Sequence, residues 1–316
     1  MTTVGRDGRF APSPTGRLHL GNLRTALAAW LFARHFDSRF LLRFEDLDTA
    51  SVRSEHYDTQ QIDLEALELT WDEPPLRQSE QLESYRDAIA DLERLGVLYR
   101  CYCSRKDIRE ATQAPNGLYR SRIYPGTCRT LTLTERADRE ASGRPPALRF
   151  RAAGGSRSFT DLVAGPFTST VDDFVVRRGD GTPAYNLAAT IDDAAQGVGL
   201  VVRADDLLDS TPRQLALLDA LGLPVPRYAH VPLVLNEHGD RLAKRDGAVT
   251  LADREAMGQT PVQVRSLLAA SLGLSEPGEQ PTLGDLLHRF DPAALPTEPW
   301  SIDERHIEAT DLGLGR

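Results

Sequence analysis

The chain has 316 residues, of which 41% are hydrophobic and 26% are charged, a composition that excludes a disordered chain and is typical of a globular protein with two or three domains. The first residues carry no apolar run typical of a signal peptide, and the longest apolar stretch, residues 26–33, is too short to cross a bilayer. We therefore expect a cytoplasmic protein without a membrane partner.

Strand and helix patterns alternate along the first 95 residues. A strand is predicted at 8–11, a Pro-rich loop follows it, and apolar positions at helical spacing begin at Leu20. A second strand is predicted at 40–44, and helical patterns cover 54–69 and 80–95. Such alternation is typical of a parallel sheet covered by helices.

The pattern changes at residue 96 and returns near residue 184. Between them the sequence is rich in Arg and interrupted by Pro and Gly, with strand patterns at 148–151 and 174–177, and we interpret it as an inserted domain. The predicted domains are a catalytic domain at 1–95 and 184–250, the insert at 96–183, and a helical C-terminal segment at 251–316.

The second half of the predicted catalytic domain repeats the alternation. It begins with a helix near 184–195 and a strand at 199–203, and a helix from Thr211 should end before Gly222. In the C-terminal segment, residues 260–263 resemble a capping box at the start of a helix.

Charge is unevenly distributed. Residues 100–157 hold 13 Lys or Arg against 5 Asp or Glu, although the whole chain carries a formal charge of -9. This basic block could bind a phosphate backbone, or it could be a solvated surface, and charge alone does not separate the two.

Residues 11–22, APSPTGRLHLGN, place a His and a Gly where a helix follows a strand. Helix N-termini bind phosphate because their free N–H groups and the helix dipole both favour an anion. We interpret His19, Gly21 and Asn22 as ATP-binding residues, since His19 can donate to a triphosphate and Gly21 leaves space for an adenine ring. A His-Leu-Gly tripeptide without this context is usually structural.

The longer run 9–22, RFAPSPTGRLHLGN, resembles the HIGH signature of class I aminoacyl-tRNA synthetases in its glutamyl and glutaminyl version. Residues 43–48, 180–188, 192–193 and 203–214 follow in the family's order, so the resemblance extends to about residue 250. It implies an α/β fold with a Rossmann-like parallel sheet core, split by an inserted zinc-containing α+β domain and followed by a short helical C-terminal segment.

A site for glutamate must pair one ammonium group and two carboxylates. The resemblance implies that Glu45 meets the ammonium group and that Arg9 and Arg203 meet the carboxylates, although which arginine meets which carboxylate stays open. The implied glutamate-binding residues are Arg9, Phe10, Ala11, Pro12, Ser13, Glu45, Tyr185 and Arg203.

Residues 240–247, DRLAKRDG, stand where the family has its KMSKS loop. The resemblance implies that Lys244 binds the ATP phosphates and, together with His19, acts in catalysis by stabilising charge on the leaving pyrophosphate. Arg241 and Ala243 depart from the family's pattern, and a basic surface loop is the alternative.

Three cysteines, Cys101, Cys103 and Cys128, are the only ones in the chain. They could be metal ligands or buried thiols, and no His lies between them to complete a tetrahedral zinc site. In the glutamyl-queuosine tRNA(Asp) synthetase family, C-x-C followed by Y-x-x-x-C forms such a site, and Tyr124 matches the tyrosine. This resemblance implies one structural zinc bound by Cys101, Cys103, Tyr124 and Cys128.

Length favours the same family, because about 65 residues follow the KMSKS-like loop and we expect no anticodon-binding domain. The resemblance implies that ATP, with Mg²⁺, and L-glutamate give glutamyl adenylate without tRNA. Glutamate then passes to the cyclopentenediol of queuosine in tRNA(Asp), whose stem-loop the basic insert would bind. We expect the protein to act as a monomer.

Two alternatives remain open from sequence. One is a shortened glutamyl-tRNA synthetase that charges the tRNA 3′ end. The other is a non-catalytic RNA-binding paralogue, favoured only by the altered residues 241–243.

Overall fold

The computed structural model describes residues 5–104, 106–108, 124–242 and 249–302. The helices are α1 (Leu20–His35), α2 (Glu55–Ala66), α3 (Leu82–Arg94), α5 (Leu133–Ala141), α6 (Tyr185–Ala195), α7 (Thr211–Leu221), α8 (Leu251–Ala256), α9 (Pro261–Ser271) and α10 (Leu283–Arg289). The strands are β1 (Asp7–Phe10), β2 (Phe40–Phe44), β3 (Leu76–Arg77), β4 (Leu98–Cys101), β5 (Ala147–Phe150), β6 (Ser156–Asp161), β7 (Gly165–Thr170), β8 (Phe174–Arg177), β9 (Val198–Ala204), β10 (Arg227–Val231), β11 (Val234–Leu235) and β12 (Trp300–Ser301).

A sheet of seven strands forms the centre of the molecule, in the order β3-β2-β1-β9-β10-β6-β7. All neighbouring pairs are parallel except the antiparallel hairpin β6–β7. The predicted parallel sheet is therefore confirmed. The strands predicted at 8–11, 40–44 and 199–203 are confirmed as β1, β2 and β9, and the predicted helices correspond to α1, α2, α3, α6 and α7.

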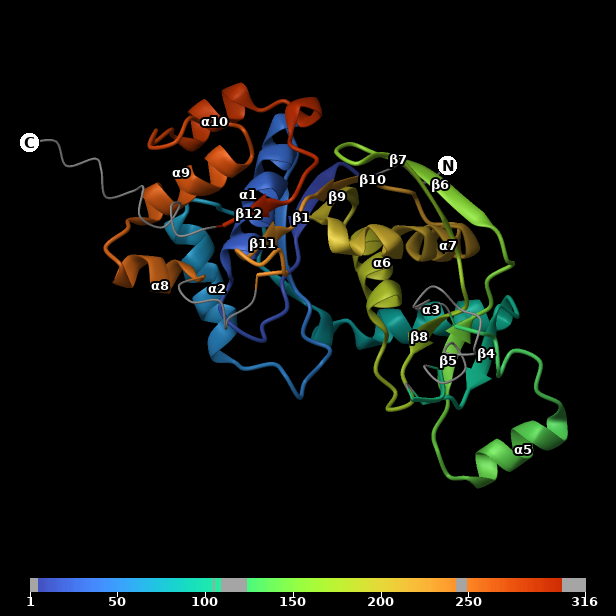
Figure 1. Ribbon diagram of the computed structural model, residues 1–316. Helices are drawn as coiled ribbons and strands as arrows, with labels where there is room; N and C mark the ends of the chain where they lie inside the picture. The colour runs from blue at the N-terminus through green and yellow to red at the C-terminus, as the bar shows by residue number, and fades with distance from the viewer. Residues whose placement is uncertain (1–4, 105, 109–123, 243–248, 303–316) are drawn as a thin grey trace, which may run out of the picture.

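Helices cover both faces of the central sheet (Figure 1). On β9, Leu200 and Val202 belong to the hydrophobic cluster around α1, whereas Val201 packs with Leu215 and Leu218 of α7 on the opposite face. Side chains of consecutive strand residues point to opposite faces, so a strand covered on both faces is apolar throughout. This explains the apolar run of β9 before Arg203, at residues 198–202.

The segment predicted as an insert contributes to two sheets. Strands β4, β5 and β8 form a separate antiparallel sheet, in which β5 and β8 correspond to the strand patterns at 148–151 and 174–177. Strands β6 and β7 instead extend the central sheet, where Asp161 pairs with Tyr228 of β10. Sequence analysis missed this hairpin because its residues alternate between partly buried and exposed and are mostly polar.

The C-terminal segment packs beside α1, where Figure 1 shows α8, α9 and α10 in orange to red. The predicted capping box is confirmed, since Thr260 and Gln263 exchange side-chain and backbone hydrogen bonds at the start of α9. Arg24 of α1 is 1% exposed and donates to Ser271 and to the Pro232 carbonyl, which joins α9 to the catalytic core. Among the described helices, none combines the length and apolar character needed to span a bilayer.

The carboxyl ends of β1 and β2 meet α6 in a buried ion cluster. Arg9 donates through Nε to Asp193 Oδ1 at 3.1 Å, and Arg43 donates through a terminal nitrogen to the same oxygen at 2.7 Å. Arg43, which is fully buried, also lies 3.7 Å from Asp192 and 3.5 Å from Glu45. Burial alone would raise the pKa of Asp193, but Arg43 and Arg9 lower it to about 2. The cluster stays ionised and holds two strands to one helix.

We expect Asp193→Asn to lower the free energy of unfolding by about 3 kcal/mol at pH 7, because two buried guanidinium groups lose their shared carboxylate. The pKa of Asp193 falls from 3.8 to about 2 on folding, so its contribution is complete above about pH 4 and is lost as the pH falls towards 2. Urea unfolding over this pH range measures the effect.

Asp91→Asn is the matched control, since Asp91 pairs with Arg94 on the exposed surface of α3. It should change the free energy of unfolding by less than about 0.5 kcal/mol. Equal changes in the free energy of unfolding for Asp193→Asn and Asp91→Asn would show that the buried cluster contributes no more to stability than an exposed ion pair.

Candidate active site

A cavity of about 500 Å³ opens at the carboxyl ends of β1 and β9. It is lined by residues 9–13 from β1 and the loop after it, by Glu45 after β2, by Tyr185 at the start of α6 and by residues 202–204 of β9. Ligands of open α/β sheets bind at this edge, because loops that follow the strands converge there. All eight residues predicted to bind glutamate line this one cavity.

His19 begins α1 at the same cavity. Its Nδ1 accepts a hydrogen bond from the Asn22 backbone N–H at 3.2 Å, and the Asn22 side chain accepts one from the His19 N–H at 3.2 Å. In the neutral ring, Nδ1 as acceptor leaves the proton on Nε2. Gln60 of α2 holds the loop before His19 through donations to the Ser13 and Gly16 carbonyls at 3.0 and 2.7 Å.

Of the residues predicted to bind ATP that the structure describes, Gly21 alone does not line the cavity. A Cβ at this position would come within 3.0 Å of the His19 ring. Glycine therefore leaves space for the imidazole. Lys244 and Ala243 lie outside the described residues, but Arg241 lines the cavity and pairs with Asp206 at 2.5 Å.

The two predicted carboxylate-binding arginines are 3% and 5% exposed and are held by the protein. Arg9 donates to both Asp193 oxygens and to the Val202 carbonyl. Arg203 donates to Tyr185 Oη at 3.0 Å, to Thr211 Oγ1 at 2.8 Å and to a histidine nitrogen. A guanidinium has five N–H donors, so each group keeps two for a ligand.

A buried chain of hydrogen bonds positions Arg203. His230 of β10 is 0% exposed, its Nδ1 lies 2.6 Å from Asp161 Oδ2, and its Nε2 accepts from Arg203 Nε at 3.0 Å. Burial lowers the pKa of His230, although the hydrogen bond to Asp161 opposes this effect. The ring is therefore neutral at pH 7, with its proton on Nδ1 facing the carboxylate.

Glu45 follows β2 and its backbone N–H donates to the Pro12 carbonyl at 2.9 Å, which joins the two loops at the cavity. Burial raises the pKa of Glu45, while Arg43 and Arg9 lower it in part. A partly desolvated carboxylate beside guanidinium groups can pair with an ammonium group that replaces the lost water.

Sequence analysis missed several residues of this site, among them Gln60, Asp161, His230 and Thr211. Gln60, Asp161 and His230 are separated from the predicted residues in sequence and belong to no motif that marks catalysis, whereas Thr211 lies within the run 203–214 but was predicted only as the start of a helix. One local signal pointed to a missed residue: His230 follows the apolar residues 228–229 and precedes Val231 in a strand-like stretch, where a polar side chain suggests a role.

The three cysteines lie close together on the separate sheet. Their Sγ atoms all lie within 4.8 Å of one another, and Cys103 and Cys128 are 3.5 Å apart. Tyr124 Oη lies 3.4 Å from Cys101 Sγ and 3.7 Å from Cys103 Sγ. A tetrahedral zinc site with Zn–S distances near 2.3 Å has sulfurs about 3.8 Å apart, so the four predicted ligands fit such an ion.

The surroundings favour negative charge on one thiol of this cluster, Cys101, whereas the hydrogen bond with Cys101 and burial raise the pKa of Cys103, and burial raises the pKa of Tyr124. Hydrogen bonds from Cys103 and Tyr124 and the Arg149 charge together outweigh burial and lower the pKa of Cys101 to about 4. The guanidinium carbon of Arg149 stands 3.7 Å from the centre of the Tyr124 ring. A buried cation beside the cluster can offset the charge of thiolate ligands.

Comparisons with known proteins identify the family of this chain. The family described as class I tRNA synthetases (E and Q), catalytic domain, matches residues 7–307. A glutamyl-Q tRNA(Asp) synthetase of Nocardia farcinica is 56% identical over 312 residues, covering 99% of this chain and 96% of that protein. One of Symbiobacterium thermophilum is 48% identical and covers 97% of this chain and 98% of that protein.

A solved structure is also similar over most of the chain. It is a glutamate tRNA ligase of Elizabethkingia meningosepticum in complex with its amino acid, with a TM-score of 0.80 and 26% identity. The similarity covers 95% of this chain and 67% of that one. The chain belongs to the class I tRNA synthetase family (E and Q), in its group of glutamyl-Q tRNA(Asp) synthetases, and it is an ATP-dependent ligase.

Proposed function

We propose that this protein, a cytoplasmic monomer, activates L-glutamate with ATP and Mg²⁺ and transfers the glutamyl group to the cyclopentenediol of queuosine in tRNA(Asp). The observation that carries the proposal is the single cavity in which Arg9, Arg203 and Glu45 converge. Two buried guanidinium groups and a carboxylate match the charges of free glutamate. The names of its full-length relatives support the same acceptor.

In the first step, a carboxylate oxygen of glutamate attacks the α-phosphorus of ATP, and the bond to pyrophosphate breaks. The nucleophile needs no general base because a carboxylate is ionised at neutral pH. Glu45 would hold the ammonium group, and Arg9 and Arg203 the carboxylates. His19 would donate to a phosphate, and Lys244 would stabilise the charge on leaving pyrophosphate. Most of the rate enhancement would come from holding glutamate and ATP in the orientation that the reaction needs.

In the second step, a hydroxyl oxygen of the cyclopentenediol attacks the carbonyl carbon of the adenylate. An ester forms, AMP leaves with the electron pair of the broken C–O bond, and the hydroxyl proton is released. The same chemistry would serve a hydroxyl at the 3′ end of a tRNA, and a comparison of tRNA(Asp) with and without queuosine separates the two acceptors.

We expect the purified protein to exchange labelled pyrophosphate into ATP when glutamate is present and tRNA is absent, and we expect Lys244→Ala to lose most of this exchange. Labelled glutamate should then appear on queuosine-containing tRNA(Asp) and not on queuosine-free tRNA(Asp). Label on both RNAs would favour a shortened glutamyl-tRNA synthetase. A complete lack of exchange would favour a non-catalytic RNA-binding paralogue.

We also expect Asp161→Asn to raise KM for glutamate about tenfold with little change in kcat, although Asp161 does not line the cavity. The amide would donate to His230 Nδ1 and move the ring proton to Nε2, where it faces Arg203 Nε–H. Exchange kinetics measure both constants. Asp219→Asn, which removes an exposed partner of Arg157, is the control and should change neither.

We infer that Cys101, Cys103, Cys128 and Tyr124 hold one structural zinc. The purified chain should contain about one zinc ion per molecule by elemental analysis, and Cys128→Ala should lose it and lower Tm, because a thiolate ligand is removed. Tyr102→Phe is the control, since its hydroxyl bonds Glu140 instead of the thiols. A wild type that contains no zinc, and whose Tm does not depend on zinc, would show that the cysteines belong to the hydrophobic core instead.

A further inference from the structure

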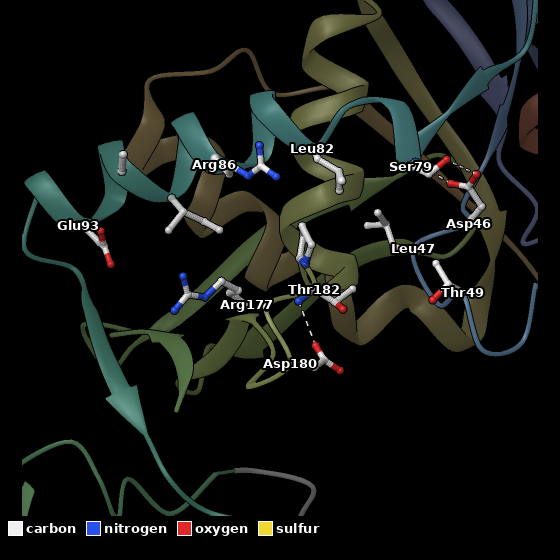
Figure 2. A pocket seen from close by; sticks show the side chains of 14 residues that line it. Asp46, Leu47, Thr49, Ser79, Leu82, Arg86, Glu93, Arg177, Asp180 and Thr182 are labelled. Atoms are coloured by element: carbon white, nitrogen blue, oxygen red, sulfur yellow. Dashed lines mark hydrogen bonds between the residues drawn. The ribbon is translucent and has the colours of Figure 1, made fainter. Parts of the chain in front are cut away.

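A second cavity, of about 560 Å³, is shown in Figure 2. It lies beside the first, because residues next to each other in sequence line the two. The chain segments that divide them are short: Glu45 lines the first cavity and Asp46 the second, and Pro183 lines the second while Tyr185 lines the first. Because consecutive Cα atoms are about 3.8 Å apart, a ligand in the second cavity would lie next to the proposed glutamate site. Its size is within the usual range of ligand cavities, roughly 300–1,000 Å³.

Two guanidinium groups at this cavity lack ionic partners within the described part of the chain. Arg86 projects from α3 and Arg177 from the end of β8, on opposite sides of the space in Figure 2. Neither takes part in an ion pair between described residues, and Arg177 Nε is buried without a hydrogen-bond acceptor. The neighbouring Arg178, in contrast, pairs with Asp180 at 2.7 Å. Unpaired guanidinium groups beside a cavity favour an anion.

Most of the carboxylates at this cavity are already occupied. Asp46 accepts hydrogen bonds of 2.7 Å from the Ser79 N–H, the Ser79 hydroxyl and the Tyr57 hydroxyl. Asp180 accepts from the Thr182 N–H and pairs with Arg178. Glu93 remains, and Figure 2 places it at the end of the cavity opposite Asp46. Among the described lining residues, Arg86 and Arg177 are therefore the charged groups that keep hydrogen-bond donors for an anionic ligand.

The rest of the wall combines apolar side chains with the hydroxyl groups of Thr49, Ser79 and Thr182. Leu82, Arg86, Ile89 and Glu93 recur at spacings of four, three and four residues along α3, so they share one face of the helix. Leu82 is 37% exposed, so part of its side chain is available for contact with a ligand. Leu47 and Pro183 complete the apolar surface. An anion with a flat apolar group attached matches this wall.

We propose that the second cavity binds one nucleotide of a single-stranded RNA segment, with its phosphate between Arg86 and Arg177 and its base against Leu82 and Leu47. This inference rests on the proposed function, because it assumes that the acceptor nucleoside enters the first cavity. A nucleotide adjacent to that nucleoside along the strand would then reach the second cavity. Proteins read single-stranded RNA loops in this way, through phosphate contacts and bases laid on side chains.

The test uses the full chain and a labelled anticodon stem-loop of tRNA(Asp), with binding measured by fluorescence anisotropy. We expect the double variant Arg86→Ala, Arg177→Ala to bind the RNA about tenfold or more weakly. The association constant should also depend less steeply on salt, with the magnitude of the slope of log K against log salt reduced by about one. Glu93→Gln should strengthen binding. Arg94→Ala, at the exposed end of the same helix, should leave the affinity within about twofold.

Glutamate-dependent pyrophosphate exchange without RNA separates the two proposals, because neither Arg86 nor Arg177 lines the glutamate cavity. Normal exchange in the double variant with unchanged RNA affinity would overturn the nucleotide site alone. A lack of exchange in the wild type would refute the proposed function. If AMP competes with the RNA for the wild type but not for the double variant, the nucleotide site is supported. If AMP binds without any effect on RNA binding, the second cavity is a site for a free nucleotide and the proposal is wrong.

Discussion

The buried ion cluster of Arg9, Arg43 and Asp193 is the constraint on which the site depends. Charges removed from water are tolerated only when they are paired and hydrogen-bonded, so each member determines where the others can lie. Because Arg9 belongs to β1, Arg43 to β2 and Asp193 to α6, the cluster joins three elements distant in sequence. It also places Arg9 and Glu45 at the mouth of one cavity. Stability and ligand geometry therefore share the same contacts.

A second set of contacts reaches the site from the opposite edge of the sheet. The β6–β7 hairpin lies within residues 96–183, the segment predicted as an insert, yet β6 pairs with β10 of the central sheet. This pairing brings Asp161 to His230, and His230 in turn holds Arg203. The intervening segment thus contributes directly to the orientation of a cavity residue.

The loops after β2 and before α6 face two cavities at once. Glu45 and Tyr185 face the first, while Asp46 and Pro183 face the second. An enzyme that must bring a small amino acid and a large nucleic acid to one reacting bond benefits from such shared walls, because binding in either cavity orders the same backbone. The cysteine cluster lies on the separate β4-β5-β8 sheet, where its expected role is structural.

The sequence by itself determined the alternation of strands and helices, the parallel sheet and the part of the cavity formed by residues 9–13, because periodicity and the run 9–22 are local signals. Glu45 and Arg203 were predicted through motif order alone. Tertiary structure decided what no local pattern records: Asp161 and His230 are 69 residues apart and meet only when β6 joins β10. The second cavity likewise exists only because α3 packs near the turn that precedes α6. Hydrogen bonds and burial between distant segments depend on packing, and packing is a property of the folded chain.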